Sequence, residues 1–272
     1  MGAHRPKQSS PASNSNDVGG DAAQDFSRTI YDGGRLRALF DEMSGTYGVV
    51  NFLSSFGFTR RWRRQCVELA QLKAGDRVCD LMTGMGECWD EILKGIGREK
   101  GTICAVDFSP AMIAAARQRL SKYPGVEVYE RDVFDPAFAR DALATENPGE
   151  CRFDAIVCCF GVKTLEPRMY ARLVELCRRL LKPGGRFSFV EISVPSAAIL
   201  RWPLQFYLRY LIPWIGRLCL GNPDNYRMLG VYTRAFGDCA RLHASFADAG
   251  CDARYHRLFF GSATAVSGTV PG

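Results

Sequence analysis

Two glycines and two acidic residues lie where the chain leaves three successive apolar runs. Gly84 and Gly86 follow the first run. Asp107 ends the second, and Asp132 follows the third. In an open α/β sheet, ligands bind beyond the carboxyl ends of the strands, where an acidic residue accepts hydrogen bonds from ribose hydroxyls. Glycines let the backbone approach a ligand closely. A tight turn or a helix-capping acid would explain each feature alone, but together they predict a site for an adenosine-type cofactor.

The residues around the glycines favour one cofactor. A dinucleotide-binding loop has a third glycine three residues after the second, but Trp89 stands at that distance from Gly86. Glu87 would bring negative charge to a pyrophosphate. A zwitterionic amino acid with a sulfonium tolerates that charge, and Asp80 can face its cationic end. Asp132 is placed to accept a hydrogen bond from an adenine amino group. These residues predict S-adenosylmethionine rather than NAD.

Apolar runs alternate with amphipathic segments along most of the chain, which is typical of a doubly wound α/β fold. We expect a Rossmann-like, mostly parallel sheet with an N-terminal helical segment at 35–72 and an inserted helical cap at 196–235. The expected strands are 77–81, 102–107, 126–129, 153–160, 186–191, 252–259 and 263–266, and the expected helices are 89–94, 111–120, 167–181 and 238–249. One domain is expected over 26–272, after a disordered arm at 1–25.

The composition argues against several classes of protein. Apolar residues make up 47% of the 272 residues, enough for a full core. No apolar run reaches the ~18–20 residues of a membrane span, and the formal charge of +6 comes with no recognisable nucleic-acid module. The 11 cysteines, several within apolar runs, indicate buried thiols in a reducing cytosol. Because no Cys-x-x-Cys pair occurs, no metal site is expected. The protein is predicted to be cytoplasmic, without a signal peptide.

Longer motifs extend the pattern. They are Asp80-Leu-x-x-Gly-x-Gly86, Ala105-Val-Asp-x-Ser-x-x-Met112, Phe153-Asp154, Phe160-Gly161 and Leu180-Leu-Lys-Pro-Gly-Gly-Arg186, with Phe40-Asp41 before them and Asn222-x-Asp-x-Tyr-Arg-x-Leu229 after them. This order resembles class I methyltransferases, and more narrowly the ubiquinone/menaquinone-biosynthesis C-methyltransferases of the UbiE type. The resemblance implies methyl transfer from S-adenosylmethionine to a small hydrophobic or aromatic metabolite, with C-methylation favoured.

One departure from that family keeps other functions open. Lys163-Thr164 stands where those enzymes have Arg-Asn, and lysine keeps the charge but loses the bidentate geometry of arginine. Aminocarboxypropyl transfer or cyclisation, each releasing methylthioadenosine, would fit a site changed in this way. A non-catalytic relative is the third alternative.

The resemblance also implies the site residues. The cofactor would be held by Tyr47, Asp80, Thr83, Gly84, Gly86, Asp107, Phe108, Met112, Asp132, Val133 and Cys159. Within this set, Asp107 would hold the ribose, and Asp132 with Val133 would bracket the adenine. Candidates for the catalytic base or orienting group are Lys163, Tyr232 and Arg234, with Glu191 and Tyr226 beside them. A surface position for Lys163 and a strand-capping role for Glu191 are the structural alternatives.

The cap region is aromatic and basic. It carries Trp202, Phe206, Tyr207, Tyr210 and Trp214, with arginines at 201, 209 and 217. These side chains would form a core against the sheet or a lid over an apolar acceptor pocket. The predicted partner is a small molecule and not a nucleic acid. Peripheral membrane contact and a homodimer stay open.

Overall fold

The computed structural model describes residues 30–54, 58–98, 100–144, 152–212, 214, 217 and 223–272. Of residues 44–54, 208, 223 and 226 it describes the backbone alone. The predicted arm at 1–25 lies outside the described residues.

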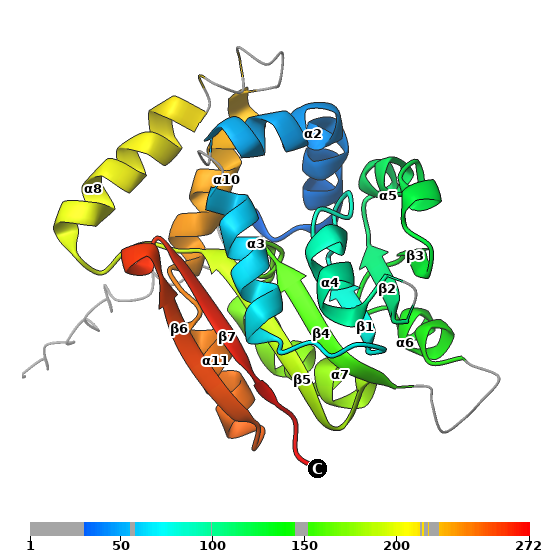
Figure 1. The fold of residues 1–272 in the computed structure, drawn as a ribbon. Coiled ribbons are helices and arrows are strands. Elements are labelled where there is room, and N and C mark those ends of the chain that lie inside the picture. Colours follow the sequence, from blue (N-terminus) through cyan, green and yellow to red (C-terminus); the bar gives the residue numbers. More distant parts are fainter. Residues whose placement is uncertain are drawn as a thin grey trace, which may run out of the picture.

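Seven strands form one sheet in the order β3-β2-β1-β4-β5-β7-β6 (Figure 1). The strands are β1 (Arg77–Leu81), β2 (Thr102–Asp107), β3 (Val126–Glu130), β4 (Phe153–Cys159), β5 (Leu181–Ile192), β6 (Asp252–Leu258) and β7 (Ala263–Thr269). The first five are parallel, whereas β7 runs antiparallel to both β5 and β6. The predicted doubly wound, mostly parallel sheet is confirmed. Strand order reverses between β1 and β4, which is where such a sheet binds ligands.

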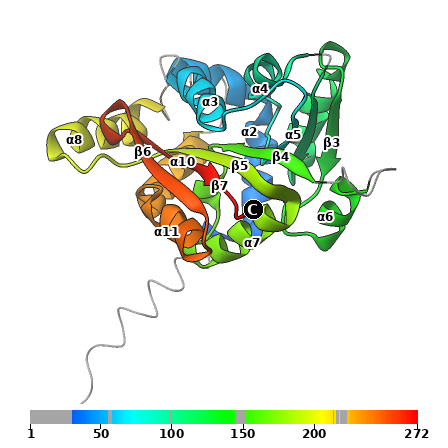
Figure 2. The same ribbon diagram turned by 60° about the horizontal axis from the view of Figure 1, so that its bottom comes forward.

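Helices cover both faces of the sheet, as Figure 2 shows. On one face lie α3 (Phe58–Leu69), α4 (Trp89–Ile96) and α5 (Pro110–Arg117), and on the other α6 (Pro136–Ala142), α7 (Tyr170–Leu180) and α11 (Ala240–Asp248). Successive strand side chains point to opposite faces. In β1, Val78 therefore joins the core under α3 and α4, and Cys79 joins the core under α6 and α7.

Two elements differ most from the sequence prediction, while α5 and β7 end three residues from their expected ends. Helix α6 was missed because its seven residues are too few to show a clear helical period. Its start was nevertheless encoded, since Asp135 Oδ1 accepts a hydrogen bond from Ala137 N (2.9 Å) and Pro136 follows the cap. Strand β5 begins at Leu181 rather than at 186, because Leu181 pairs with Phe153 of β4 before a register shift.

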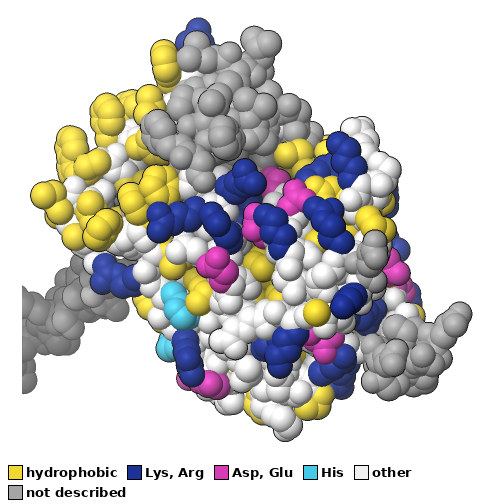
Figure 3. All heavy atoms as spheres, in the orientation of Figure 1, with side chains coloured by type: hydrophobic (Ala, Val, Ile, Leu, Met, Phe, Trp, Pro, Cys, Tyr) yellow, Lys and Arg dark blue, Asp and Glu magenta, His cyan; other side chains and the backbone are white. Residues whose placement is uncertain are grey.

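Three further helices stand beyond the carboxyl ends of the strands. They are α2 (Gly33–Ser54), α8 (Ala198–Phe206) and α10 (Pro223–Phe236), and a π-helical turn η4 (Tyr207–Leu211) continues α8. Leu39 and Met43 of α2 share an apolar cluster with Ile212, just after η4. Figure 1 shows that α8 then projects from the body of the molecule, and Figure 3 shows hydrophobic side chains gathered over this helix.

Candidate active site

The loop between β1 and α4 is held in one shape by its own contacts. Thr83 Oγ1 donates a hydrogen bond to Asp80 Oδ2 (2.5 Å) and accepts one from Trp89 Nε1 (3.0 Å). Gly86 has a φ of +78°, and a Cβ atom there would lie 2.5 Å from the Trp89 ring. Only glycine fits that position without a shift of the indole, so the sequence fixes the loop closely around Asp80.

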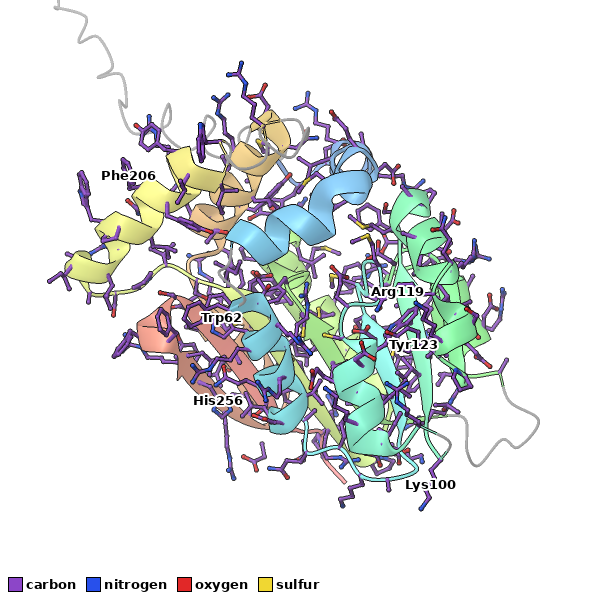
Figure 4. All side chains as sticks on the ribbon, turned by 45° about the horizontal axis from the view of Figure 1, so that its top comes forward. Trp62, Lys100, Arg119, Tyr123, Phe206 and His256 are labelled. Carbon is purple, nitrogen blue, oxygen red and sulfur yellow. The ribbon has the colours of Figure 1, made fainter. Side chains whose placement is uncertain are left out.

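Arg119, labelled beside Tyr123 in Figure 4, supports the loop from the outside. Its Nη1 donates to the Met85 carbonyl oxygen (2.6 Å), and its Nη2 donates to Tyr123 Oη (2.9 Å). These contacts tie the loop to the chain that follows α5.

Asp107, at the carboxyl end of β2, joins the loop to the next element. Its Oδ2 accepts a hydrogen bond from Gly84 N (2.9 Å), and its Oδ1 accepts one from Ser109 N (3.0 Å). Burial raises the pKa of the Asp107 carboxyl, although these backbone hydrogen bonds oppose the shift. Asp107 therefore lies at the end of a strand and beside the glycine loop, as predicted.

Three carboxyl groups make this end of the site electronegative. Burial, with the nearby charges of Glu87 and Asp107, raises the pKa of Asp80 to about 7, while the Thr83 hydrogen bond opposes the shift. Glu87 pairs with Arg63 of α3, with Nη2 and Oε1 3.4 Å apart. A cationic ligand placed beside Asp80 would stabilise its ionised form.

A cavity of about 290 Å³ opens beside these carboxyl groups. Its walls come from the residues that follow β1, β2, β3 and β4, from the start of α2, and from the short helical turns after β4. Strained backbone marks two of these positions: Met82 and Phe160 both have positive φ, 54° and 67°. A Cβ atom on Gly161 would lie 2.6 Å from Met82 Sδ, so the loops after β1 and β4 pack directly together.

Helix α2 forms the wall of the cavity opposite the sheet. Asp41 Oδ1 accepts a hydrogen bond from Ser109 Oγ (2.5 Å), which fixes α2 to the start of α5. One residue earlier, the Phe40 ring meets the Phe108 ring edge-on, with centroids 6.3 Å apart. The Phe40-Asp41 pair noted in the sequence therefore holds α2 against the residues that follow β2.

Most of the predicted cofactor residues meet at this cavity. Those that line it are Asp80, Thr83, Gly84, Asp107, Phe108, Met112, Asp132, Val133 and Cys159. Gly86 shapes the loop without lining the cavity. The side chain of Tyr47 lies outside the described residues.

The three residues predicted to be catalytic are not among the lining residues. Lys163 is buried, and its Nζ pairs with Glu191 Oε1 (2.8 Å) and donates to the Phe160 carbonyl oxygen (2.8 Å). Tyr232 donates to the Ile30 carbonyl oxygen (2.6 Å), which ties α10 to the residues before α2. Arg234 is exposed on α10. Lys163 and Tyr232 thus have hydrogen-bond partners within the fold, and their catalytic roles stay predictions. The alternative of a surface Lys163 was wrong, because its side chain is buried.

The cavity has a second polar region that the sequence did not reveal. Glu166 and Arg168 line it after β4 and form an ion pair, with Oε2 and Nε 2.6 Å apart. Tyr31 lines it from the residues before α2, and burial and the charge of Glu166 raise the pKa of its phenol. These residues belong to no sequence motif, because Glu166 and Arg168 lie in a short turn after β4 and Tyr31 lies far away in the chain, before α2.

For the cap segment at 196–235, a core against the sheet and a lid over the cavity were both left open. No described residue of α8 or η4 lines it, whereas Leu36 and Phe40 of α2 do. Of the two alternatives, the described part of α8 and η4 supports packing, here against α2 rather than the sheet, and α2 covers the cavity. Among the described residues, no group of three His, Cys, Asp or Glu side chains could hold a metal ion.

Comparison with known proteins decides the family. Residues 29–269 match the model of the ubiE/COQ5 methyltransferase family. The chain belongs to this family. It is 34% identical to the demethylmenaquinone methyltransferase of Thermus thermophilus over 86% of this chain and 100% of that protein. It is 27% identical to the ubiquinone/menaquinone biosynthesis C-methyltransferase UbiE of Pseudomonas paraeruginosa, over 87% of this chain and 89% of that protein.

Solved structures agree on the fold. Human N-acetylserotonin methyltransferase in complex with S-adenosylmethionine aligns with a TM-score of 0.53 at 17% identity, over 86% of this chain and 59% of that chain. A putative methyltransferase from Haloferax volcanii, bound to the activator Trm112, aligns with a TM-score of 0.52 at 17% identity, over 86% of this chain and 98% of that chain. The predictions of a class I methyltransferase fold and of an S-adenosylmethionine-dependent methyltransferase are confirmed.

Proposed function

We propose that this methyltransferase transfers the methyl group of S-adenosylmethionine to a ring carbon of a small hydrophobic acceptor of the hydroquinone type. The observation that carries the proposal is the division of one cavity into two parts. Carboxyl groups gather at the end formed by β1 and β2, and apolar side chains with one ion pair line the rest.

The acidic end suits the cofactor. Asp80 has a carboxyl whose pKa is raised to about 7 without a ligand, so a sulfonium or ammonium group beside it would restore the ionised form. Asp107 is proposed to hold the ribose, and Asp132 with Val133 to bracket the adenine, in line with their places at successive strand ends. The residues present therefore fit S-adenosylmethionine, which supplies an electrophilic methyl group when bound.

The remainder of the cavity suits an apolar ring. Leu36 and Phe40 of α2 line one side, and Leu165 and Met169 line another. The names of the relatives, demethylmenaquinone methyltransferase and ubiquinone/menaquinone biosynthesis C-methyltransferase, support a quinone-type acceptor. An apolar cavity positions such a ring and excludes water from the displacement.

We assign the proton transfer to Glu166. The sulfur–methyl bond breaks as the ring carbon forms a bond to the methyl group, and that carbon then loses its hydrogen as a proton. Apart from Asp132, which we place beside the adenine, Glu166 is the described carboxyl that lines the cavity away from the acidic end. It lies close enough to Tyr31 to raise the pKa of that phenol. Arg168, paired with Glu166, is proposed to keep the carboxylate oriented.

The test is turnover with a labelled methyl group and a chemically reduced demethylnaphthoquinone that carries a short isoprenoid tail. We expect S-adenosylhomocysteine and a ring-methylated product in equal amounts. Methylthioadenosine as the product, or a label on oxygen instead of carbon, would overturn the proposed reaction. Glu166→Gln should lower kcat at least roughly tenfold with little change in cofactor affinity, whereas Glu175→Gln, on the exposed side of α7, should leave kcat unchanged.

A further inference from the structure

The outer side of α8 and η4 carries a stripe of exposed aromatic residues. Trp202 is 76% exposed, Phe206 56%, Tyr210 55% and Trp214 58%. Residues four apart on a helix lie on the same side. Trp202, Phe206 and Tyr210 therefore form one row, in which the Phe206 and Tyr210 ring centroids are 5.1 Å apart, and Trp214 follows beyond η4. Figure 4 shows Phe206 on the side of α8 that faces away from the sheet. Exposed rings in such number are unusual on a soluble surface.

The fold does not need this stripe for its core. The inner side of the same segment already packs, because Leu204, Tyr207 and Ile212 contact the cluster of Leu39 and Met43 on α2. The stripe also lies apart from the active-site cavity, which no described residue of α8 lines. The exposed rings therefore have neither a packing role nor a place in the site.

A second exposed apolar element lies beside the start of α8. The turn between β6 and β7 places Phe259 and Phe260 in the left-handed region, with φ of 42° and 57°, and leaves them 48% and 71% exposed. Arg257 Nη2 of the same hairpin donates to Ser196 Oγ (3.0 Å), just before α8. Two successive non-glycine residues in this conformation are unusual, because it brings each Cβ close to the following carbonyl oxygen. Strain held at an exposed Phe-Phe tip indicates a function for that tip.

The charge of this face has one sign. No Asp or Glu occurs between residues 192 and 223, whereas arginines stand at 201, 209 and 217. Helix α3 adds exposed Arg60, Arg61 and Arg64. Phe58 of that helix packs against Phe259, with ring centroids 4.3 Å apart. In Figure 3, Lys and Arg side chains border the hydrophobic side chains of α8.

We propose that this docking face, formed by the outer side of α8–η4 and the Phe259-Phe260 tip, lies on the surface of an anionic lipid bilayer. Trp and Tyr side chains favour the headgroup level of a membrane, and arginines are attracted to anionic headgroups. A face with aromatic rings, flanking arginines and no acid is typical of peripheral binding. No described helix has the length and hydropathy of a membrane span.

The charge pattern argues against a second copy of the chain as the occupant. A twofold dimer through this face would bring together two copies of a surface that carries arginines and no acid, and like charges across an interface oppose association. A bilayer carries the complementary charge. The inference rests on the proposed function in one respect: a hydrophobic ring acceptor partitions into lipid, so docking would bring the cavity to it.

The experiment is sedimentation of the full chain with vesicles of phosphatidylcholine alone and with added phosphatidylglycerol. We expect binding that needs the anionic lipid and weakens as salt rises. The variant Trp202→Ser/Phe206→Ser/Phe260→Ser should bind at least roughly tenfold less. Arg201→Ser/Arg209→Ser should lose more affinity than the control Lys94→Ser/Arg98→Ser, which removes the same charge from the last turn of α4 and the residues just after it.

S-adenosylmethionine affinity, measured by calorimetry, should be the same in all variants, and this readout is independent of the acceptor. Equal binding of the aromatic variant and the unaltered chain would overturn the proposal. So would the absence of binding to either vesicle. Loss of a dimer in the aromatic variant by sedimentation velocity, without vesicle binding of the unaltered chain, would assign the face to self-association instead.

Discussion

The buried pair of Lys163 and Glu191 gives the sharpest test of the site. Their side chains are 4% and 0% exposed, and Nζ lies 2.8 Å from Oε1. Glu191 Oε2 also accepts a hydrogen bond from Lys163 N (3.1 Å), and Oε1 accepts one from Ile192 N (2.8 Å). Both charges are thus fully enclosed and paired. We expect Lys163→Met to destabilise the fold and to leave the chemical step intact.

The magnitude follows from the geometry. At 2.8 Å and an effective dielectric constant near 20, the attraction is about 6 kcal/mol. Desolvation of the two charges offsets much of it, but removal of one partner leaves the other buried and unpaired, which costs about 3–5 kcal/mol. With an m-value of about 3 kcal/mol/M, the urea midpoint should fall by roughly 1 to 1.7 M.

The assay is urea unfolding followed by circular dichroism, with kcat measured under conditions where each variant is folded. Lys163→Met/Glu191→Gln should recover at least half of the loss, since no unpaired charge remains. The control is Lys182→Met, whose partner Asp154 forms an ion pair that is 39% and 24% exposed; it should cost less than ~1 kcal/mol. The structural role of Lys163 would be refuted if Lys163→Met kept its stability and lost kcat a hundredfold or more. Lys163 would then act directly in the chemical step.

Three further predictions concern the cofactor end. The raised pKa of Asp80, about 7, means that the carboxyl of the unliganded site holds a proton below that pH. Affinity for the cationic cofactor should therefore rise between roughly pH 6 and 8, with proton release in calorimetry. An unchanged slope of affinity against pH in Asp80→Asn would contradict this. Asp107→Ala removes the acceptor for Gly84 N and should weaken cofactor binding roughly 10- to 100-fold; unaltered affinity would overturn the ribose assignment. Gly86→Ala places Cβ 2.5 Å from Trp89 and should lower the unfolding free energy by roughly 2–4 kcal/mol, against roughly 1–2 for Gly184→Ala, which has positive φ but open space around it.

The pH dependence of stability follows from the same carboxyl. A raised pKa in the folded state means that the folded protein binds the Asp80 proton more tightly than the unfolded chain does. The contribution of this group to stability is therefore full below its unfolded pKa of roughly 4 and falls as the pH rises to about 7. Bound cofactor should reverse this trend.

The strands of the sheet, and the acidic residues that gather at their carboxyl ends, could be predicted from the sequence pattern. Strands and helices long enough to show a period could be predicted, with the ends of α5 and β7 shifted by three residues. The larger departures are the missed seven-residue α6 and the start of β5. The meeting of Asp80, Asp107 and Asp132 at one cavity could be predicted because parallel strands bring their carboxyl ends to one edge. For these residues, local spacing is enough to define the place in space.

The residues of the proposed acceptor end, and the side of α8 that faces outward, became clear from the tertiary contacts alone. Glu166, Arg168 and Tyr31 meet through irregular segments, and periodicity says nothing about such segments. Lys163 has a charge that is typical of a surface or a catalytic site, but it is buried because Glu191 lies on the neighbouring strand to neutralise it. From the sequence, the aromatic residues of α8 are compatible with a core or with a lid. The stripe faces outward because Leu204 and Ile212, on the other side of the segment, pack against α2. When both sides of a helix are apolar, the sequence does not show which side the rest of the chain will cover.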